Sequence, residues 1–179
     1  MSTGPLHDLA ESTESMAVLD GPADFLTATA SKLTADEETR RLLTGEALGT
    51  HLHPASVHLP IGTAISALIV DLLAGEEGNT SAGILSAASL ATAVPSILSG
   101  FADYGRIREL PVRRLGAAHA LANVAGNTLN LTSLLARMSG SRGTARGGLL
   151  AAVAAFGVGG LLGGHLAHSE GAPEETAEL

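Results

Sequence analysis

The sequence predicts an all-α fold: an up-down bundle of four transmembrane helices, preceded by an N-terminal amphipathic helix. Composition, long apolar runs and short polar connectors support this prediction. Of the 179 residues, 45% are hydrophobic but only 2% are aromatic. The apolar residues are mainly Ala, Leu, Val and Ile, interleaved with 22 glycines. Small residues favour closely packed membrane helices, because helices in lipid associate through close van der Waals contact.

Four apolar runs follow one another along the chain. They cover residues 54–74, 83–101, 115–136 and 147–167. Each is near the ~20 residues that a helix needs to cross a bilayer, and none has the charged stripe of a soluble helix. The connectors cover residues 75–82, 102–114 and 137–146. Such short connectors predict antiparallel neighbours. Asp71 is the one ionisable residue other than histidine well inside a run, and we expect it to reach the interface.

The flanking segments are polar. Residues 1–20 are expected to be loose, and residues 21–50 form a helical segment in which residues 22–44 are amphipathic. This helix either packs on the main domain or lies along the membrane surface. The transmembrane domain then covers residues 51–168, and residues 169–179 form an acidic, flexible tail.

Charge and cysteine content exclude several classes of protein. A net charge of −8 argues against a nucleic-acid partner. The absence of cysteine excludes disulfides, thiolate metal sites and Cys-ligated iron–sulfur clusters within this chain. The N-terminus lacks a basic region followed by an apolar one, so we expect no cleavable signal.

Basic residues predict the orientation in the membrane. The side that holds both termini carries Lys32, Arg40, Arg41, Arg106, Arg108, Arg113 and Arg114. The opposite side carries Arg137, Arg142 and Arg146. The positive-inside rule therefore predicts a multi-pass protein of the cell (inner) membrane with both termini in the cytoplasm.

Four histidines are expected near the cytoplasmic face. His53 and His58 begin the first predicted helix, His119 begins the third, and His165 ends the fourth. Topology alone would bring them to one membrane level. Titratable residues in membrane helices usually face the bundle interior and mark functional sites. The alternative is that these histidines only bind water and helix ends at the headgroup level.

A cofactor site is the functional hypothesis for this cluster. Imidazole binds Fe, Cu, Zn and Ni, and a bundle can hold a haem between two axial histidines. His119 and His165 are the axial candidates, with His53 or His58 as alternatives. Asn123 lies one turn after His119, so it could bind the cofactor or a group beside it. Asn127 and Asn130 continue that line, and for these two residues simple bonding between helices is favoured.

Several motifs resemble the DUF2231 family of predicted four-helix membrane proteins. The first is HPASVHLPIG at residues 53–62, followed by Asp71. SGFADY at residues 99–104 and GAAHALAN at 116–123 are also similar, as are LLAR at 134–137 and LGGHL at 162–166. The resemblance covers roughly residues 41–170. It implies a four-helix membrane domain in a redox context, because members of one branch are joined to a Rieske-type iron–sulfur domain. That branch commonly has Asp at the position of His58.

Three functions remain open from the sequence. The first is a membrane protein that binds haem b and passes electrons, with a Rieske-type or other redox protein as its partner. The second is a non-haem site for a transition metal, or a metal-transport path. The third is a cofactor-free structural or assembly subunit. No nucleophile–base pair or phosphate-binding loop is visible, so we expect a binding or electron-transfer subunit rather than an enzyme. Lipid is the expected surrounding, and a homo-oligomer is left open.

Overall fold

The computed structural model describes residues 4–167, and this part of the chain is helical, with no strand. The all-α prediction is therefore confirmed. The chain divides into two compact units. The first unit comprises Met1–His53, Ile97–Leu121 and Val158–Leu179; the second comprises Pro54–Ser96 and Ala122–Gly157.

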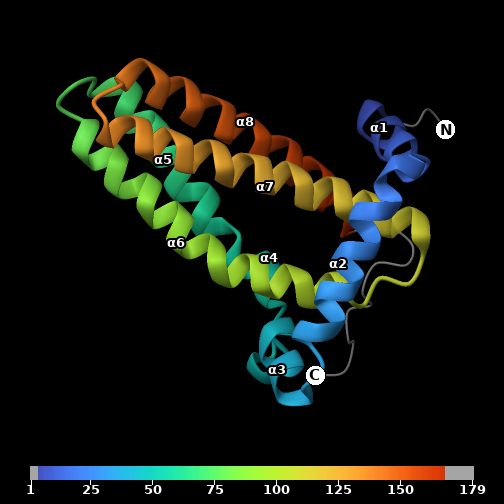
Figure 1. Cartoon of the computed structure of the whole chain (residues 1–179). Helices are drawn as coiled ribbons and strands as arrows, with labels where there is room; N and C mark the ends of the chain where they lie inside the picture. Colours follow the sequence, from blue (N-terminus) through green and yellow to red (C-terminus); the bar gives the residue numbers. More distant parts are fainter. Residues whose placement is uncertain (1–3, 168–179) are drawn as a thin grey trace. The chain divides into compact units, whose positions relative to one another are not determined.

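The helices vary widely in length (Figure 1). The N-terminal part holds α1 (Pro5–Glu14), α2 (Asp20–Leu33) and α3 (Glu37–Thr44), with 3₁₀ turns η1 (Ala17–Leu19) and η2 (Glu46–Leu48). Then come α4 (Leu52–Ser56), α5 (His58–Leu73), α6 (Asn79–Tyr104), α7 (Leu110–Met138) and α8 (Arg142–Leu166). The last three helices are longer than the apolar runs that predicted them, because polar residues at their ends are also helical. They contribute residues to both units.

The N-terminal segment differs from its prediction. Residues 5–14 lie in the stretch expected to be loose, yet they form α1, which begins with Pro5 after Gly4. Proline suits this first position because its missing N–H would have no helical partner there. The single helix expected over residues 22–44 is interrupted after Thr34. A new helix, α3, begins at Glu37, and the preceding Asp36 caps it by accepting a hydrogen bond from the Thr39 N–H at 2.8 Å. The tail at 169–179 lies outside the described residues.

A glycine ends α3. Gly45 follows α3 with φ +86°, a left-handed conformation that side chains rarely adopt. A Cβ atom at Gly45 would also collide with the carbonyl oxygen of Thr50. This position therefore needs glycine for two independent reasons.

Many of the buried side chains on the long helices are small, and many of the large apolar ones are exposed. Ala64, Ala67, Ser86, Ser89 and Ser99 are all 0% exposed. In contrast, the exposed fractions of Ile84, Val124 and Leu135 are 65%, 59% and 55%. Large contiguous exposed apolar patches are uncommon on soluble monomeric proteins.

Three stretches among the described residues are long and apolar enough to cross a membrane. They are Leu52–Leu73, Asn79–Tyr104 and Arg142–Leu166. Although α7 has 29 residues, it is not among them. It carries arginines near its start and the polar side chains of His119, Asn123, Asn127 and Asn130, which lower its hydropathy.

Within the second unit, polar bonds join consecutive helices. Ser89 of α6 donates to the Pro60 carbonyl of α5 at 2.8 Å. The Asn130 amide of α7 donates to the Ser86 carbonyl at 3.3 Å, and the Ser133 hydroxyl donates to the Ala145 carbonyl of α8 at 2.6 Å. Asn130 of α7 bonds to Ser86 of α6, and Arg137, further along α7, bonds to Asn79, which lies earlier on α6. These two helices are therefore antiparallel.

Within the first unit, α2 packs against the end of α6 and the start of α7. Leu26 contacts a buried cluster of Tyr104, Ile107 and Val112. Arg114 binds Asp20 through two nitrogens, at 2.6 and 3.2 Å, and Arg113 binds Asp24 at 2.8 Å. Helix α2 therefore packs on the rest of its unit through both apolar and ionic contacts.

This docking is expected to weaken in acid. The hydrogen bond from Arg114, helped by the charges of Arg114 and Arg113, outweighs desolvation and lowers the pKa of Asp20. A lowered pKa in the folded state means that the carboxylate stabilises docking above the ordinary aspartate value of about 3.9. The contribution is lost as pH falls from there through the folded-state pKa. Hydrogen exchange of residues 20–33, corrected for intrinsic rates, should show lower protection at pH 3 than at pH 7.

An Asp20→Asn variant is the control for this experiment. It should show reduced protection of α2 already at pH 7, with a smaller further change in acid. Equal protection of the parent chain at both pH values would contradict the proposed role of the ion pair.

Candidate functional site

His119 lies on α7 with its ring against α8. Its Nδ1 atom is 2.7 Å from the carbonyl oxygen of Gly159. Because a carbonyl oxygen can only accept, Nδ1 carries the proton and Nε2 is the ring's lone-pair nitrogen. A Cβ atom at Gly163 would lie 2.8 Å from Cε1 of this ring. Glycine at that position thus allows α8 to approach the imidazole closely.

His53 lies on α4 and packs against α6 in a similar way. A Cβ atom at Gly100 would lie 2.9 Å from the Cε1 atom of His53. The ring centroids of His53 and His119 are 6.2 Å apart, with an interplanar angle of 85°. Segments distant in the sequence therefore bring two half-buried imidazoles together in the first unit.

The other predicted site residues lie elsewhere. The ring of His165 has its centroid 5.7 Å from that of His7, which the sequence analysis did not single out. His58 belongs to the second unit, where its side chain is exposed and its Nδ1 is 3.4 Å from the Ala55 carbonyl oxygen. Asn123 is also in the second unit and is half-buried.

His7 could have been noticed from its spacing. It lies four residues before Glu11, with which it makes a 3.2 Å contact on α1. This is the spacing that places two side chains on one face of a helix. The expectation that residues 1–20 are loose leaves this spacing without a helix on which it would matter.

Asp103 and Tyr104, at the end of α6, have different roles. The Tyr104 hydroxyl lies 2.9 Å from the Arg113 carbonyl and 3.2 Å from the Ala23 carbonyl, so it anchors α2 and α7. Asp103 is half-buried, and its Oδ1 atom has no hydrogen-bond partner among the described residues.

The number of potential ligand side chains that lie close together limits which kind of metal site this part of the chain could form. Among residues 4–167, no three His, Cys, Asp or Glu side chains come together closely enough to hold a metal ion. Zinc sites use three or four protein ligands. A haem needs only two axial ligands from the protein, because the porphyrin supplies the rest. The His53–His119 pair has the number of side chains that a haem takes from a protein, and fewer than a zinc site uses.

Two imidazoles that bind one metal ion have a characteristic ring separation. With metal–nitrogen bonds of about 2 Å on each side, two imidazoles that share a metal have ring centroids roughly 6 Å apart. A proton on Nδ1 that is donated to a backbone carbonyl is also the usual state of a metal-binding histidine. The observed centroid distance of 6.2 Å is close to this value, and the Nδ1 proton is assigned for His119. On His53, Nδ1 and Nε2 lie 3.0 and 3.4 Å from the position that a Cβ atom at Gly100 would take.

A second polar cluster, in the second unit, was missed by sequence reasoning. Asp71 was expected to reach the interface, but its side chain is only 1% exposed. Its Oδ1 accepts from Arg137 Nη1 at 2.7 Å, and its Oδ2 accepts from Arg146 Nε at 2.6 Å. Arg146 also donates to the Asp71 carbonyl oxygen at 2.8 Å.

The sequence did contain a signal for this cluster. A carboxylate inside an apolar run requires a partner. Arg137 and Arg146 stand at the two ends of the predicted connector 137–146, which lies on the same side of the bundle as the end of the first run. Both arginines were used only to predict orientation.

No family model, no curated protein and no solved structure matches this chain.

Proposed function

We propose that this chain is an integral membrane protein that binds haem b between His53 and His119 and passes electrons. Four spans, with α7 as the third in order, would place both termini on one side, and the distribution of Lys and Arg favours the cytoplasm. The large apolar side chains exposed along the long helices, with small ones buried, support membrane insertion. The length of α7 and the bond from Asn130 to α6 support its inclusion as a span.

The paired imidazoles are the observation that carries the haem proposal. Haem supplies a one-electron iron couple when bound. The residues of this chain orient the two imidazoles: Gly159 holds the His119 ring through Nδ1, and Gly100 and Gly163 give the two rings room. Holding His119 in one tautomer keeps Nε2 as the metal-binding atom. A Rieske-type or other redox protein remains the proposed partner.

The test is an absorption spectrum of detergent-extracted protein from cells supplied with a haem precursor. The parent chain should stay in the membrane fraction after an alkaline wash and show a Soret band. His119→Ala and His53→Ala should each lose most of this band. His58→Ala is the matched control and should keep it, because the proposal needs only two ligands and His58 is exposed.

Two results would overturn the haem assignment. One is a colourless preparation that binds no added haem. The other is an unchanged band in His119→Ala. Elemental analysis of the same samples separates non-haem metal binding, and a metal-free, colourless protein that co-purifies with a fixed partner would indicate an assembly subunit. Recovery only in the soluble fraction would contradict membrane insertion.

A further inference from the structure

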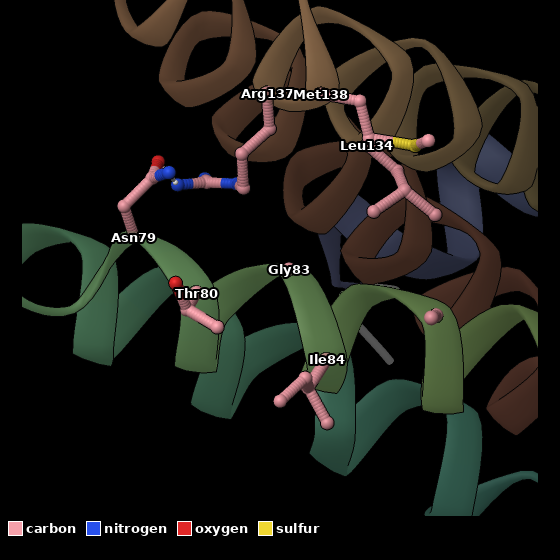
Figure 2. Close-up of a pocket in the computed structure, with 8 residues that line it drawn as sticks. Asn79, Thr80, Gly83, Ile84, Leu134, Arg137 and Met138 are labelled. Atoms are coloured by element: carbon pink, nitrogen blue, oxygen red, sulfur yellow. Dashed lines mark hydrogen bonds between the residues drawn. The ribbon is translucent and has the colours of Figure 1, made fainter. Parts of the chain in front are cut away.

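A pocket of about 320 Å³ lies between the start of α6 and the end of α7 in the second unit. Figure 2 shows Arg137, at the end of α7, extending its guanidinium towards Asn79 on α6. The lining includes Asn79, Thr80 and Ile84 from α6, and Leu134, Arg137 and Met138 from α7. One side of the pocket is thus polar and cationic, and the other is apolar.

Arg137 has unused hydrogen-bonding capacity at this pocket. Its side chain is 4% exposed, and its Nη1 donates to Asp71 Oδ1 and to Asn79 Oδ1, both at 2.7 Å. Its Nε and Nη2 atoms are buried and have no hydrogen-bond partner among the described residues. Leaving buried donors of a charged group unbonded costs more than leaving neutral ones unbonded, so these two N–H groups favour an added acceptor.

The charges around Asp71 do not balance among the described residues. Asp71 is the one described carboxylate that contacts Arg137, and it also contacts Arg146, whose side chain is 40% exposed. Two arginines therefore share one aspartate, which leaves an excess of one positive charge. Glu76, whose side chain is 89% exposed, lies 3.8 Å from a third arginine, Arg142. An anion at the pocket would compensate the excess charge.

The apolar side of the pocket narrows the class of anion. The exposed fractions of Ile84 and Met138 are 65% and 77%. Large apolar side chains beside the guanidinium of Arg137 suit a ligand that has an anionic headgroup and a hydrocarbon chain. Asn79 and Arg137 lie at helix ends, which is where lipid headgroups lie in a spanning bundle.

We propose that this pocket binds one anionic phospholipid, with its phosphate accepting hydrogen bonds from Nε and Nη2 of Arg137 and one acyl chain lying along Ile84, Leu134 and Met138. The half-buried Asn79 amide, which now accepts from Nη1, is the group that moves to admit the phosphate. The proposal rests on membrane insertion but not on the His53–His119 pair, so a failed haem experiment leaves it standing.

Native mass spectrometry of the detergent-purified full chain, with added dioleoyl phosphatidylglycerol, tests this site. The parent chain should retain one lipid molecule. Arg137→Lys keeps the charge and the pairing with Asp71 but removes the two donors, so binding should weaken about tenfold. Ala87→Phe fills the pocket from an exposed position on α6 and should also reduce binding. Ala91→Phe, one turn further along and outside the pocket lining, is the matched control and should bind normally.

Thermal unfolding measurements distinguish a phospholipid headgroup from free inorganic phosphate as the bound anion. Inorganic phosphate should leave the unfolding temperature of the parent chain unchanged, while phosphatidylglycerol should raise it. If inorganic phosphate gives the same rise, the site holds a free anion and the lipid assignment is wrong. Equal retention of phosphatidylcholine, or unchanged lipid binding in both Arg137→Lys and Ala87→Phe, would also overturn the proposal.

Discussion

Replacing Asp71 with alanine should destabilise the protein more than any other single substitution considered for the second unit. The side chain is 1% exposed, and each of its oxygens is bonded to a different arginine. Its removal leaves the buried guanidinium of Arg137 without a counter-charge. Removing one partner of a buried ion pair costs about 3–5 kcal/mol. In a chain of this size, that loss lowers the unfolding temperature by roughly 10 °C.

Thermal unfolding in detergent measures this effect. Asp71→Asn, which keeps the shape and loses the charge, should fall between the parent and Asp71→Ala. Glu77→Ala removes an exposed acid from the connector between α5 and α6 and should change little. Replacing Asp71, Arg137 and Arg146 together by Leu, Met and Met should recover much of the loss, because no buried charge then lacks a partner. An unchanged unfolding temperature in Asp71→Ala would show that this network does not stabilise the fold.

Replacing Gly163 with alanine should displace the His119 ring. The added Cβ would lie 2.8 Å from Cε1 and 2.9 Å from Nδ1 of that ring. Either α8 moves away from α7 or the ring turns, and both break the 2.7 Å bond to the Gly159 carbonyl. Loss of such an orienting bond typically weakens metal binding about 10–100-fold. Crowding of this kind also destabilises a packed interface by about 1–3 kcal/mol.

Gly160→Ala is the matched control, because its Cβ would meet nothing within 4 Å on the same helix. It should leave haem affinity unchanged and stabilise the helix by about 0.5–1 kcal/mol. Haem titration and thermal unfolding measure the two variants side by side. The second readout is independent of any cofactor, so it tests the close contact even if no haem binds. Equal stability and equal haem affinity in both variants would contradict this role for Gly163.

Apolar runs predicted where the long helices lie, but not how the first of them is divided. His53 and His58 begin the same run, yet they belong to different helices and different units. Pro60 has no N–H to bond to the carbonyl of Ser56, where α4 ends, so the helix is interrupted there. Even in one unbroken helix, a separation of five residues would place the two rings roughly 140° apart. The two histidines therefore could not have served the same site through a shared face.

The partners of polar residues could be predicted only in part. Hydropathy identifies Asp71 as unusual, and the predicted topology leads us to expect four histidines at one membrane level. Neither showed that Asp71 is buried with two arginines, or that His53 meets His119 while His165 meets His7. These pairings depend on the rotation of each helix about its axis. That rotation is set by close contacts at particular small residues, such as Gly100 and Gly163.

The sequence by itself determined the helical class and the positions of the apolar helices, because both follow from the character of consecutive residues. Only the tertiary structure decided which imidazoles pair and which arginines neutralise Asp71. It also decided where an arginine is left with unbonded donors beside an apolar surface. The physical reason is that hydropathy is a local property, whereas a site forms from side chains of distant segments whose register is fixed by packing.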